Sequence, residues 1–162
     1  MAGLRRHAGQ FADHHCQHRY AGAVRGGAGA EGAASVSTAC AFCALPPERI
    51  VFSNQQGVVV RDAYPISTGH TLIIPRRHVG SFFAIDVAER DALLALLEEA
   101  KRRLDKEFNP DGYNVGINDG AAAGQTVAHL HIHLIPRYAG DRKDPRGGVR
   151  WIMPHKAKYW SP

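Results

Sequence analysis

The chain has 162 residues, 44% of them hydrophobic, which suits one globular domain with its own core. No apolar run approaches the roughly 20 residues that span a bilayer, and no signal-peptide stretch opens the chain, so we expect a cytoplasmic protein with no membrane partner. The net charge of +5 comes from Lys and Arg spread along the chain, which favours small anionic substrates over nucleic acid as the partner.

The N-terminal segment, residues 1–39, differs in composition from the rest. Gly, Ala, His and Arg dominate it, large aliphatic residues are nearly absent, and residues 22–34 are close to low complexity. Such a segment cannot bury enough apolar surface to offset its ordering entropy. We therefore predict a disordered Gly/Ala/His-rich extension over residues 1–39 and one folded domain over residues 40–162.

The predicted domain opens with a Cys-x-x-Cys pair, Cys40 and Cys43. This spacing occurs in zinc sites and in redox pairs, and also where the thiols do neither. Only three cysteines occur in the chain, so a site of four thiolates is excluded. Two histidines would have to complete a tetrahedral metal shell.

Regular structure is predicted to begin at Ile50. Residues 50–52 and 57–61 are typical of short strands around a polar turn, and residues 71–74 of a buried strand closed by Pro75.

A long helix follows. Asp86 is in a position to cap it, and Glu89 three residues later would complete a capping-box-like pair. The helix is predicted to end at residues 109–112, which include a proline and a glycine. Its apolar face has three- and four-residue spacing and is made by Leu93, Leu97, Ala100, Leu104 and Phe108. Strands flanking one long helix predict an α+β domain.

The most informative stretch follows a strand over residues 113–117 and a loop over residues 118–124. In residues 129–135 three histidines alternate with large aliphatic residues, and Pro136 and Arg137 are expected to stop the strand. Alternate strand residues point to opposite faces, so the histidines at 129, 131 and 133 should share one face, with the aliphatic residues in the core beneath. Imidazole can act as nucleophile, general acid or base, or metal ligand near neutral pH.

Residues 124–137, GQTVAHLHIHLIPR, resemble the signature of the histidine triad (HIT) family of nucleotide hydrolases and transferases. Residues 61–78 are similar to that family's upstream nucleotide-pocket segment, in which an acidic or amide residue precedes a loop, Gly-His and an apolar strand ending in Pro. The two segments stand in the family's order, and the resemblance extends from about Cys40 to Tyr159. It implies a HIT-like half-sheet of antiparallel strands with one long helix, pairing into a homodimer.

The resemblance also implies catalytic roles. The middle histidine of the triad, His131, would be the nucleophile that forms a nucleotidyl-histidine, and His133 would contact phosphate oxygens. Gln125 and Thr126 would donate hydrogen bonds to bridging or leaving oxygens, as preorganised stabilisers of developing charge.

Binding roles follow in the same way. Asp62 matches the residue that accepts hydrogen bonds from ribose hydroxyls, Asn118 matches a phosphate-contacting amide, and His70 would line the pocket near the phosphates. Gln125 and His133 would also touch the nucleotide. From the residues alone, Asp62 could be a turn residue, Asn118 a loop amide and His70 a packing residue.

Members of this family with a Cys-x-x-Cys in this place complete a metal site with two histidines, which correspond to His78 and His129. The resemblance therefore implies a structural zinc ion held by Cys40, Cys43, His78 and His129, with no open position for water. No organic cofactor is expected.

Two further regions bear on the substrate. We expect Ile50, Phe52 and Ile73 to form an apolar wall for the base. Residues 144–154 resemble a C-terminal segment of bacterial relatives, in which Arg150 or Trp151 would contact the leaving group. Trp151 could equally be a core or dimer-interface residue.

Together these features predict a hydrolase that cleaves an adenosine-bearing phosphoanhydride or phosphoramidate. Three alternatives remain open: a dinucleoside polyphosphate phosphorylase using the same nucleophile, a non-catalytic nucleotide sensor, and a DNA-end processing enzyme of the wider superfamily.

Overall fold

The structure is a computed structural model that describes residues 40–160. The predicted extension over residues 1–39 lies outside this range. Five strands form one antiparallel sheet in the order β1-β2-β3-β5-β4. The strands are β1 (Ile50–Ser53), β2 (Gly57–Arg61), β3 (Thr71–Pro75), β4 (Gly112–Gly116) and β5 (Ile132–Arg137).

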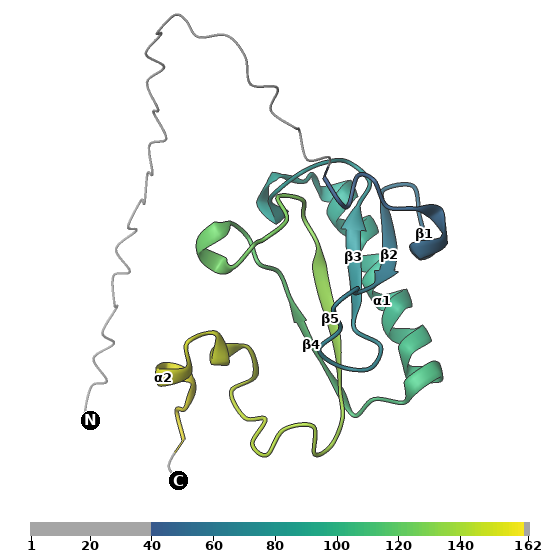
Figure 1. Cartoon of the computed structure of the whole chain (residues 1–162). Coiled ribbons are helices and arrows are strands. Elements are labelled where there is room, and N and C mark those ends of the chain that lie inside the picture. Colours follow the sequence, from purple (N-terminus) through teal and green to yellow (C-terminus); the bar gives the residue numbers. More distant parts are fainter. Residues whose placement is uncertain (1–39, 161–162) are drawn as a thin grey trace, which may run out of the picture. The chain divides into compact units, whose positions relative to one another are not determined.

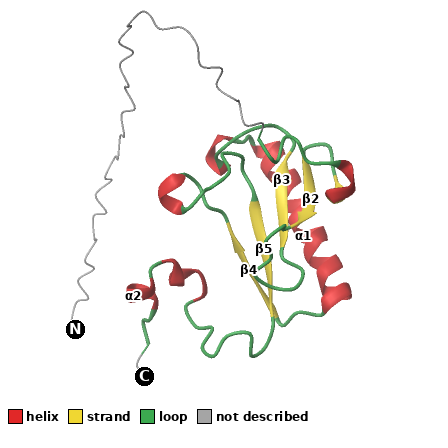
Figure 2. Cartoon of the chain, viewed as in Figure 1, coloured by secondary structure: helices red, strands yellow, loops and turns green. Residues whose placement is uncertain are grey.

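One long helix, α1 (Val87–Phe108), packs against the sheet on the side of β2, β3 and β5 (Figure 1). Figure 2 shows these two layers, with the strands in yellow and the helix in red. The α+β class and the antiparallel half-sheet with one long helix are confirmed. None of the helices within residues 40–160 combines the length and the apolar character that crossing a bilayer requires.

The helix ends as the sequence predicts. Asp86 accepts a hydrogen bond from the backbone N–H of Glu89 (2.8 Å), and Asn109 closes the helix in the left-handed conformation (φ 46°). The capping box is not reciprocal, however, because the buried side chain of Glu89 instead accepts a hydrogen bond from Arg77 (2.7 Å). Burial of an ionised carboxylate requires such a partner.

The core between α1 and the sheet follows the predicted periodicity with one shift. Leu93, Ala100 and Leu104 are buried, but Leu96 is buried where Leu97 is only partly so. The triad segment contributes its aliphatic residues to this core, since Leu130, Ile132 and Leu134 are each at most 2% exposed.

The triad strand differs from the prediction at both ends. The strand begins at Ile132, so His129 and His131 precede it. The backbone before Ile132 makes other hydrogen bonds: Leu130 N–H donates to the Val79 carbonyl (2.6 Å), and the His129 carbonyl accepts from the His131 ring. The strand also continues through Pro136 to Arg137. Because β3 pairs only with residues 132–134 of β5, Pro136 lies where β5 has one neighbour and costs no ladder bond to β3.

The face of the sheet opposite α1 is called here the open face. Its floor is a second apolar cluster, Val58, Val60, Leu72 and Ile74, against which Phe42, Leu45 and Ile50 pack. Leu72 pairs with His133 across β3 and β5, and paired residues in an antiparallel ladder share a face. The histidines therefore belong to the open face.

Candidate functional site

His131 lies at the end of the segment that leads into β5, with its ring almost fully buried (7% exposed). Its Nδ1 is 2.8 Å from the backbone carbonyl oxygen of His129. A carbonyl only accepts hydrogen bonds, so Nδ1 carries a proton, and in the neutral ring Nε2 then has the lone pair. The fold thus holds His131 in the tautomer that a nucleophile requires.

His133, two residues further on, contacts both His131 and His70. The rings of His131 and His133 are 5.0 Å apart, and His133 Nδ1 lies 3.1 Å from Nε2 of the buried His70. His70 Nδ1 in turn lies 3.4 Å from Asp62 Oδ2. Asp62, His70 and His133 thus form a row of contacts that ends at the triad.

Asp62 also makes the turn expected of a loop carboxylate, because its Oδ1 accepts from the backbone N–H of Tyr64 (2.8 Å). Asp62 can therefore be both a turn residue and a residue of the binding site. The turn fixes the carboxylate, whose second oxygen faces His70.

The surroundings favour neutral imidazoles. Burial, followed by the neighbouring rings of His131 and His70, lowers the pKa of His133 to about 4, against the opposing effect of Asp62. Burial also lowers the pKa of His70, and the Asp62 carboxylate offsets this only in part. His133 is therefore neutral near pH 7.

The lowered pKa of His133 predicts how stability depends on pH. An unfolded histidine titrates near 6.5. Between that pH and about 4 the unfolded chain binds a proton that folded His133 does not, so the free energy of unfolding falls as the pH drops through this window. We expect His133→Gln to flatten the fall in melting temperature between pH 6.5 and about 4. His155→Gln, which removes an exposed imidazole outside the site, is the control, and equal pH profiles for wild type and His133→Gln would contradict the assignment.

The loop before the triad is tied to the segment after β3. The Gln125 amide accepts from Gly120 N–H (2.8 Å) and donates to the Gly80 carbonyl (2.7 Å). Thr126 and Asn118 are exposed, and no hydrogen bond places them against the histidines in this structure. Asp119, which sequence reasoning passed over, accepts from the Ser81 hydroxyl (2.9 Å) and Phe82 N–H (2.8 Å). The position of Asp119 beside Asn118 in a polar loop is the sequence feature that could have indicated this role.

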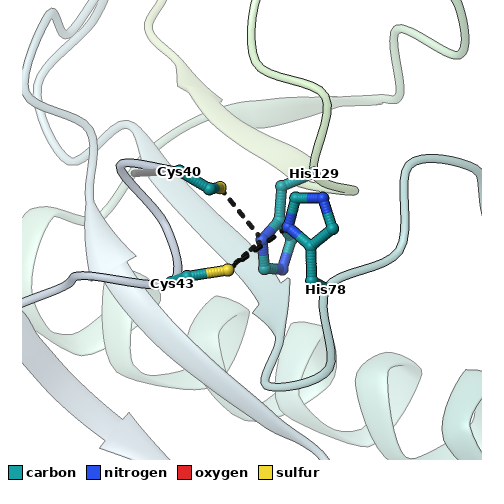
Figure 3. A group of neighbouring side chains, drawn as sticks. All are labelled: Cys40, Cys43, His78 and His129. Carbon is teal, nitrogen blue, oxygen red and sulfur yellow. Dashed lines mark hydrogen bonds between the residues drawn. The ribbon is translucent and has the colours of Figure 1, made fainter. Parts of the chain in front are cut away.

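The four predicted metal ligands come together, and they are called here the Cys/His cluster (Figure 3). Cys40 Sγ lies 3.4 Å from His129 Nδ1, and Cys43 Sγ lies 3.2 Å from His78 Nδ1 and 3.6 Å from His129 Nδ1. A tetrahedral zinc ion, with bonds of about 2.3 Å to sulfur and about 2.0 to 2.1 Å to nitrogen, separates such atoms by about 3.5 Å. The donor set and its spacing therefore fit zinc.

The protein prepares these ligands. His129 Nε2 lies 2.9 Å from the Pro75 carbonyl oxygen, which directs Nδ1 toward the two sulfurs. Burial lowers the pKa of His129, which favours the neutral imidazole that binds a metal. Partial desolvation of the exposed Cys43 sulfur and its interaction with Cys40 raise the pKa of Cys43, so metal binding would release protons.

One expectation about the substrate pocket is wrong, and the role of Arg150 or Trp151 at the leaving group stays a prediction. Phe52 and Ile73 belong to the core under α1, and of the three proposed wall residues only Ile50 packs on the open face. Arg150 and Trp151 are engaged within the C-terminal segment, because Arg150 donates to the carbonyls of Ala157 (3.0 Å) and Lys156 (2.9 Å) and Trp151 donates to Arg146 (2.8 Å).

The comparisons with known proteins agree with this geometry. The family model of the HIT domain matches residues 46–140. The AP-4-A phosphorylase of Mycobacterium tuberculosis is 33% identical over 117 residues, covering 66% of this chain and 58% of that protein. The asymmetrical bis(5'-nucleosyl)-tetraphosphatase of Schizosaccharomyces pombe is 39% identical over 77 residues, covering 48% of this chain and 42% of that protein.

Solved structures show the same fold. A HIT family protein from Bacillus anthracis is 33% identical with a TM-score of 0.59, covering 64% of this chain and 77% of that one. A Zn-bound histidine triad family protein from Mycobacterium smegmatis is 36% identical with a TM-score of 0.54, covering 66% of this chain and 84% of that one.

Proposed function

The chain belongs to the HIT domain family, and from this we propose that it is a hydrolase that cleaves an adenosine-bearing phosphoanhydride or phosphoramidate through a nucleotidyl-histidine. Relatives named as a phosphorylase and a tetraphosphatase support a role in nucleotide processing. The observation that carries the proposal is the 2.8 Å contact between His131 Nδ1 and the His129 carbonyl, because it leaves Nε2 free to attack.

The reaction would run in two steps. The lone pair of His131 Nε2 attacks the α-phosphorus, a phosphorus–nitrogen bond forms, and the leaving group departs with the electrons of the broken bond. The ring becomes cationic, and its Nδ1–H donated to the His129 carbonyl stabilises that charge. Water then attacks the phosphorus, releases the nucleotide and loses a proton, while Nε2 recovers its lone pair.

The other site residues would bind the substrate. Neutral His133 would donate a hydrogen bond to a phosphate oxygen, and His70 would hold His133 in place from behind. Gln125 has a second amide hydrogen that would be donated to the substrate. Thr126 and Asn118 are exposed to solvent and would hydrogen-bond to a phosphate group there.

The Asp62 oxygen that faces His70 would also accept from the ribose hydroxyls, which predicts a sugar preference. Asp62→Ala should raise KM for a ribonucleotide substrate by about ten- to a hundredfold, since lost hydrogen bonds to a charged acceptor are worth about 1.5 to 3 kcal/mol. The same variant should no longer distinguish the ribonucleotide from its 2'-deoxy analogue. The measurement is KM for the two substrates, with Asp144→Ala as an exposed-carboxylate control. Unchanged discrimination in Asp62→Ala would remove Asp62 from the ribose site.

We also propose that the Cys/His cluster holds a structural zinc ion. Support comes from the ligand spacing and from the Zn-bound relative of Mycobacterium smegmatis. Bound zinc would join the N-terminal turn to the sheet, and four protein ligands would leave no position for catalytic water. Both described cysteines are free thiols, and such ligands persist in the reducing cytoplasm, the location we predict.

A homodimer is proposed from the open edge of the sheet. Among the strands of residues 40–160, β4 has β5 as its only neighbour in the sheet, and Val115 on it is 45% exposed. Unpaired edge strands are normally covered, and a second copy of this chain would cover β4.

A phosphorylase is the second candidate, favoured by the identity to the Mycobacterium tuberculosis enzyme. Purified protein should be tested on dinucleoside polyphosphates and adenosine phosphoramidates, each with and without inorganic phosphate. Release of AMP without phosphate supports the hydrolase, whereas turnover that requires phosphate and yields a nucleoside diphosphate supports the phosphorylase. Tight AMP binding with no turnover would indicate a sensor.

The N-terminal extension is predicted to contribute nothing to this site, since every proposed site residue lies at Cys40 or beyond. Deleting residues 1–36 should leave kcat and the melting temperature unchanged, because the removed segment is poor in large aliphatic residues. A large fall in either quantity would show that the segment docks on the domain.

A further inference from the structure

Phe42 lies between the two cysteine ligands of the Cys/His cluster. The turn that contains it is closed by hydrogen bonds from the N–H groups of Cys43 (3.0 Å) and Ala44 (3.1 Å) to the Cys40 carbonyl. When both sulfurs bind a metal, the chain on either side of Phe42 is fixed. The position of its ring then depends on occupancy of the cluster.

The Phe42 ring contacts the nucleophile directly. Its centroid is 5.1 Å from that of His131, with the planes inclined at 66°, and 5.9 Å from that of His129 at 82°. Edge-to-face pairs of rings are favourable at these separations. The same ring packs on the apolar floor of the open face, so it rests on a rigid surface.

His131 needs such a neighbour. Its bond to the His129 carbonyl fixes the tautomer and anchors Nδ1, and the His133 ring packs against it at 5.0 Å, but neither contact alone stops the ring from tilting about that bond. Tilting displaces Nε2, the attacking atom, and a misplacement of about 1 Å can cost about a hundredfold in rate.

We propose that Phe42 is a positioning residue that transmits metal occupancy of the Cys/His cluster to the attacking nitrogen of His131. The proposal rests on the hydrolase function above and deepens it, because the structural metal site then governs the reaction rate. Phe42 touches both a ligand ring and the nucleophile ring, whereas Leu45 packs on the same apolar floor but lies outside the Cys-x-x-Cys turn. Leu45 therefore supplies a matched control.

The first test needs no substrate. Wild type, Phe42→Leu and Leu45→Ala, each loaded with zinc, carry ¹⁵N-labelled histidine, and the ring resonances of His131 are recorded before and after a chelator. In wild type and Leu45→Ala, chelation should shift and broaden the His131 signals. In Phe42→Leu they should be shifted while zinc is still bound, and chelation should change them little further.

The second test is kinetic. Zinc-loaded Phe42→Leu should lose about tenfold in kcat with KM within about twofold, and Leu45→Ala should lose neither. Chelation should lower kcat in wild type but add little to the loss in Phe42→Leu, because effects on one pathway are not additive.

Several results would overturn the proposal. They are wild-type His131 signals in zinc-loaded Phe42→Leu, an equal response to chelation in wild type and Phe42→Leu, loss of zinc from Phe42→Leu, or a changed KM with unchanged kcat. An equal response to chelation in the two proteins would mean that the metal site and His131 are coupled through the His129 backbone instead. Wild-type protein that turns over no nucleotide would refute the hydrolase function, while the resonance experiment would still decide the role of Phe42.

Discussion

Replacing His131 by alanine is expected to lower turnover by about 10⁴-fold or more, the order of loss caused by removing a covalent nucleophile. His129 also places one ring nitrogen on a backbone carbonyl, but its other nitrogen faces the two cysteine sulfurs, whereas Nε2 of His131 makes no hydrogen bond within the part of the chain that the structure describes. Affinity for AMP should persist, because the proposed ribose and base contacts lie on other residues. The measurements are steady-state turnover and AMP binding by calorimetry.

The control for this variant is His155→Ala, which removes an exposed imidazole outside the site. Its turnover should equal that of wild type. Retention of a tenth of wild-type turnover by His131→Ala would exclude His131 as the nucleophile. Loss of AMP binding together with turnover would mean that the substitution disturbs the pocket and not only the chemistry.

Replacing Cys43 by serine should have the second largest effect, on stability. Purified wild type is expected to carry about one zinc ion per chain, and the variant should lose most of it. Metal binding is linked to folding, since the assembled ligands exist only in the folded state. At a hundredfold excess of metal over its dissociation constant the linkage is worth about 2.7 kcal/mol, which predicts a fall in melting temperature of several degrees.

The control is Cys16→Ser, which removes the chain's third cysteine and none of the four ligands. Zinc content comes from elemental analysis and stability from thermal unfolding. Zinc-free wild-type protein with full stability would remove the metal site and return Cys40 and Cys43 to ordinary thiols.

The sequence predicts the parts of the fold that have a local cause. Alternation in the triad segment predicts burial of Leu130, Ile132 and Leu134, and the helix caps at Asp86 and Asn109 follow from side-chain chemistry at single positions. The start of β5 could not be predicted in this way. It depends on where β3 stops pairing and on the bond that ties Leu130 to Val79, and both are long-range features.

The wrong assignment of the base wall has a similar origin. Ile50 and Phe52 are two residues apart and would share a face in a regular strand, but the register of β1 against β2 shifts between them. The shift places Ile50 on the open face and Phe52 under α1. A bulge of this kind leaves no mark in the hydrophobic pattern.

The residues of the candidate site could be predicted mainly from the resemblance to the family. Cys40, Cys43, His78 and His129 come from three separate segments, so no local spacing predicts that they meet, and the structure nonetheless brings them together. Phe42 and Asp119 were missed because their roles lie in contacts with distant residues, the His131 ring and residues 81–82.

The central claim is that a nucleotide becomes bonded to His131, and trapping that species tests it most directly. Wild-type protein is mixed with an adenosine phosphoramidate, quenched within one turnover in alkaline denaturant, digested and sequenced by mass spectrometry. We predict AMP attached to His131 in wild type, formed in a burst before steady-state release, and no adduct in His131→Ala. An adduct on another residue, or turnover in which no protein-bound nucleotide accumulates even when the second step is slowed, would contradict the account.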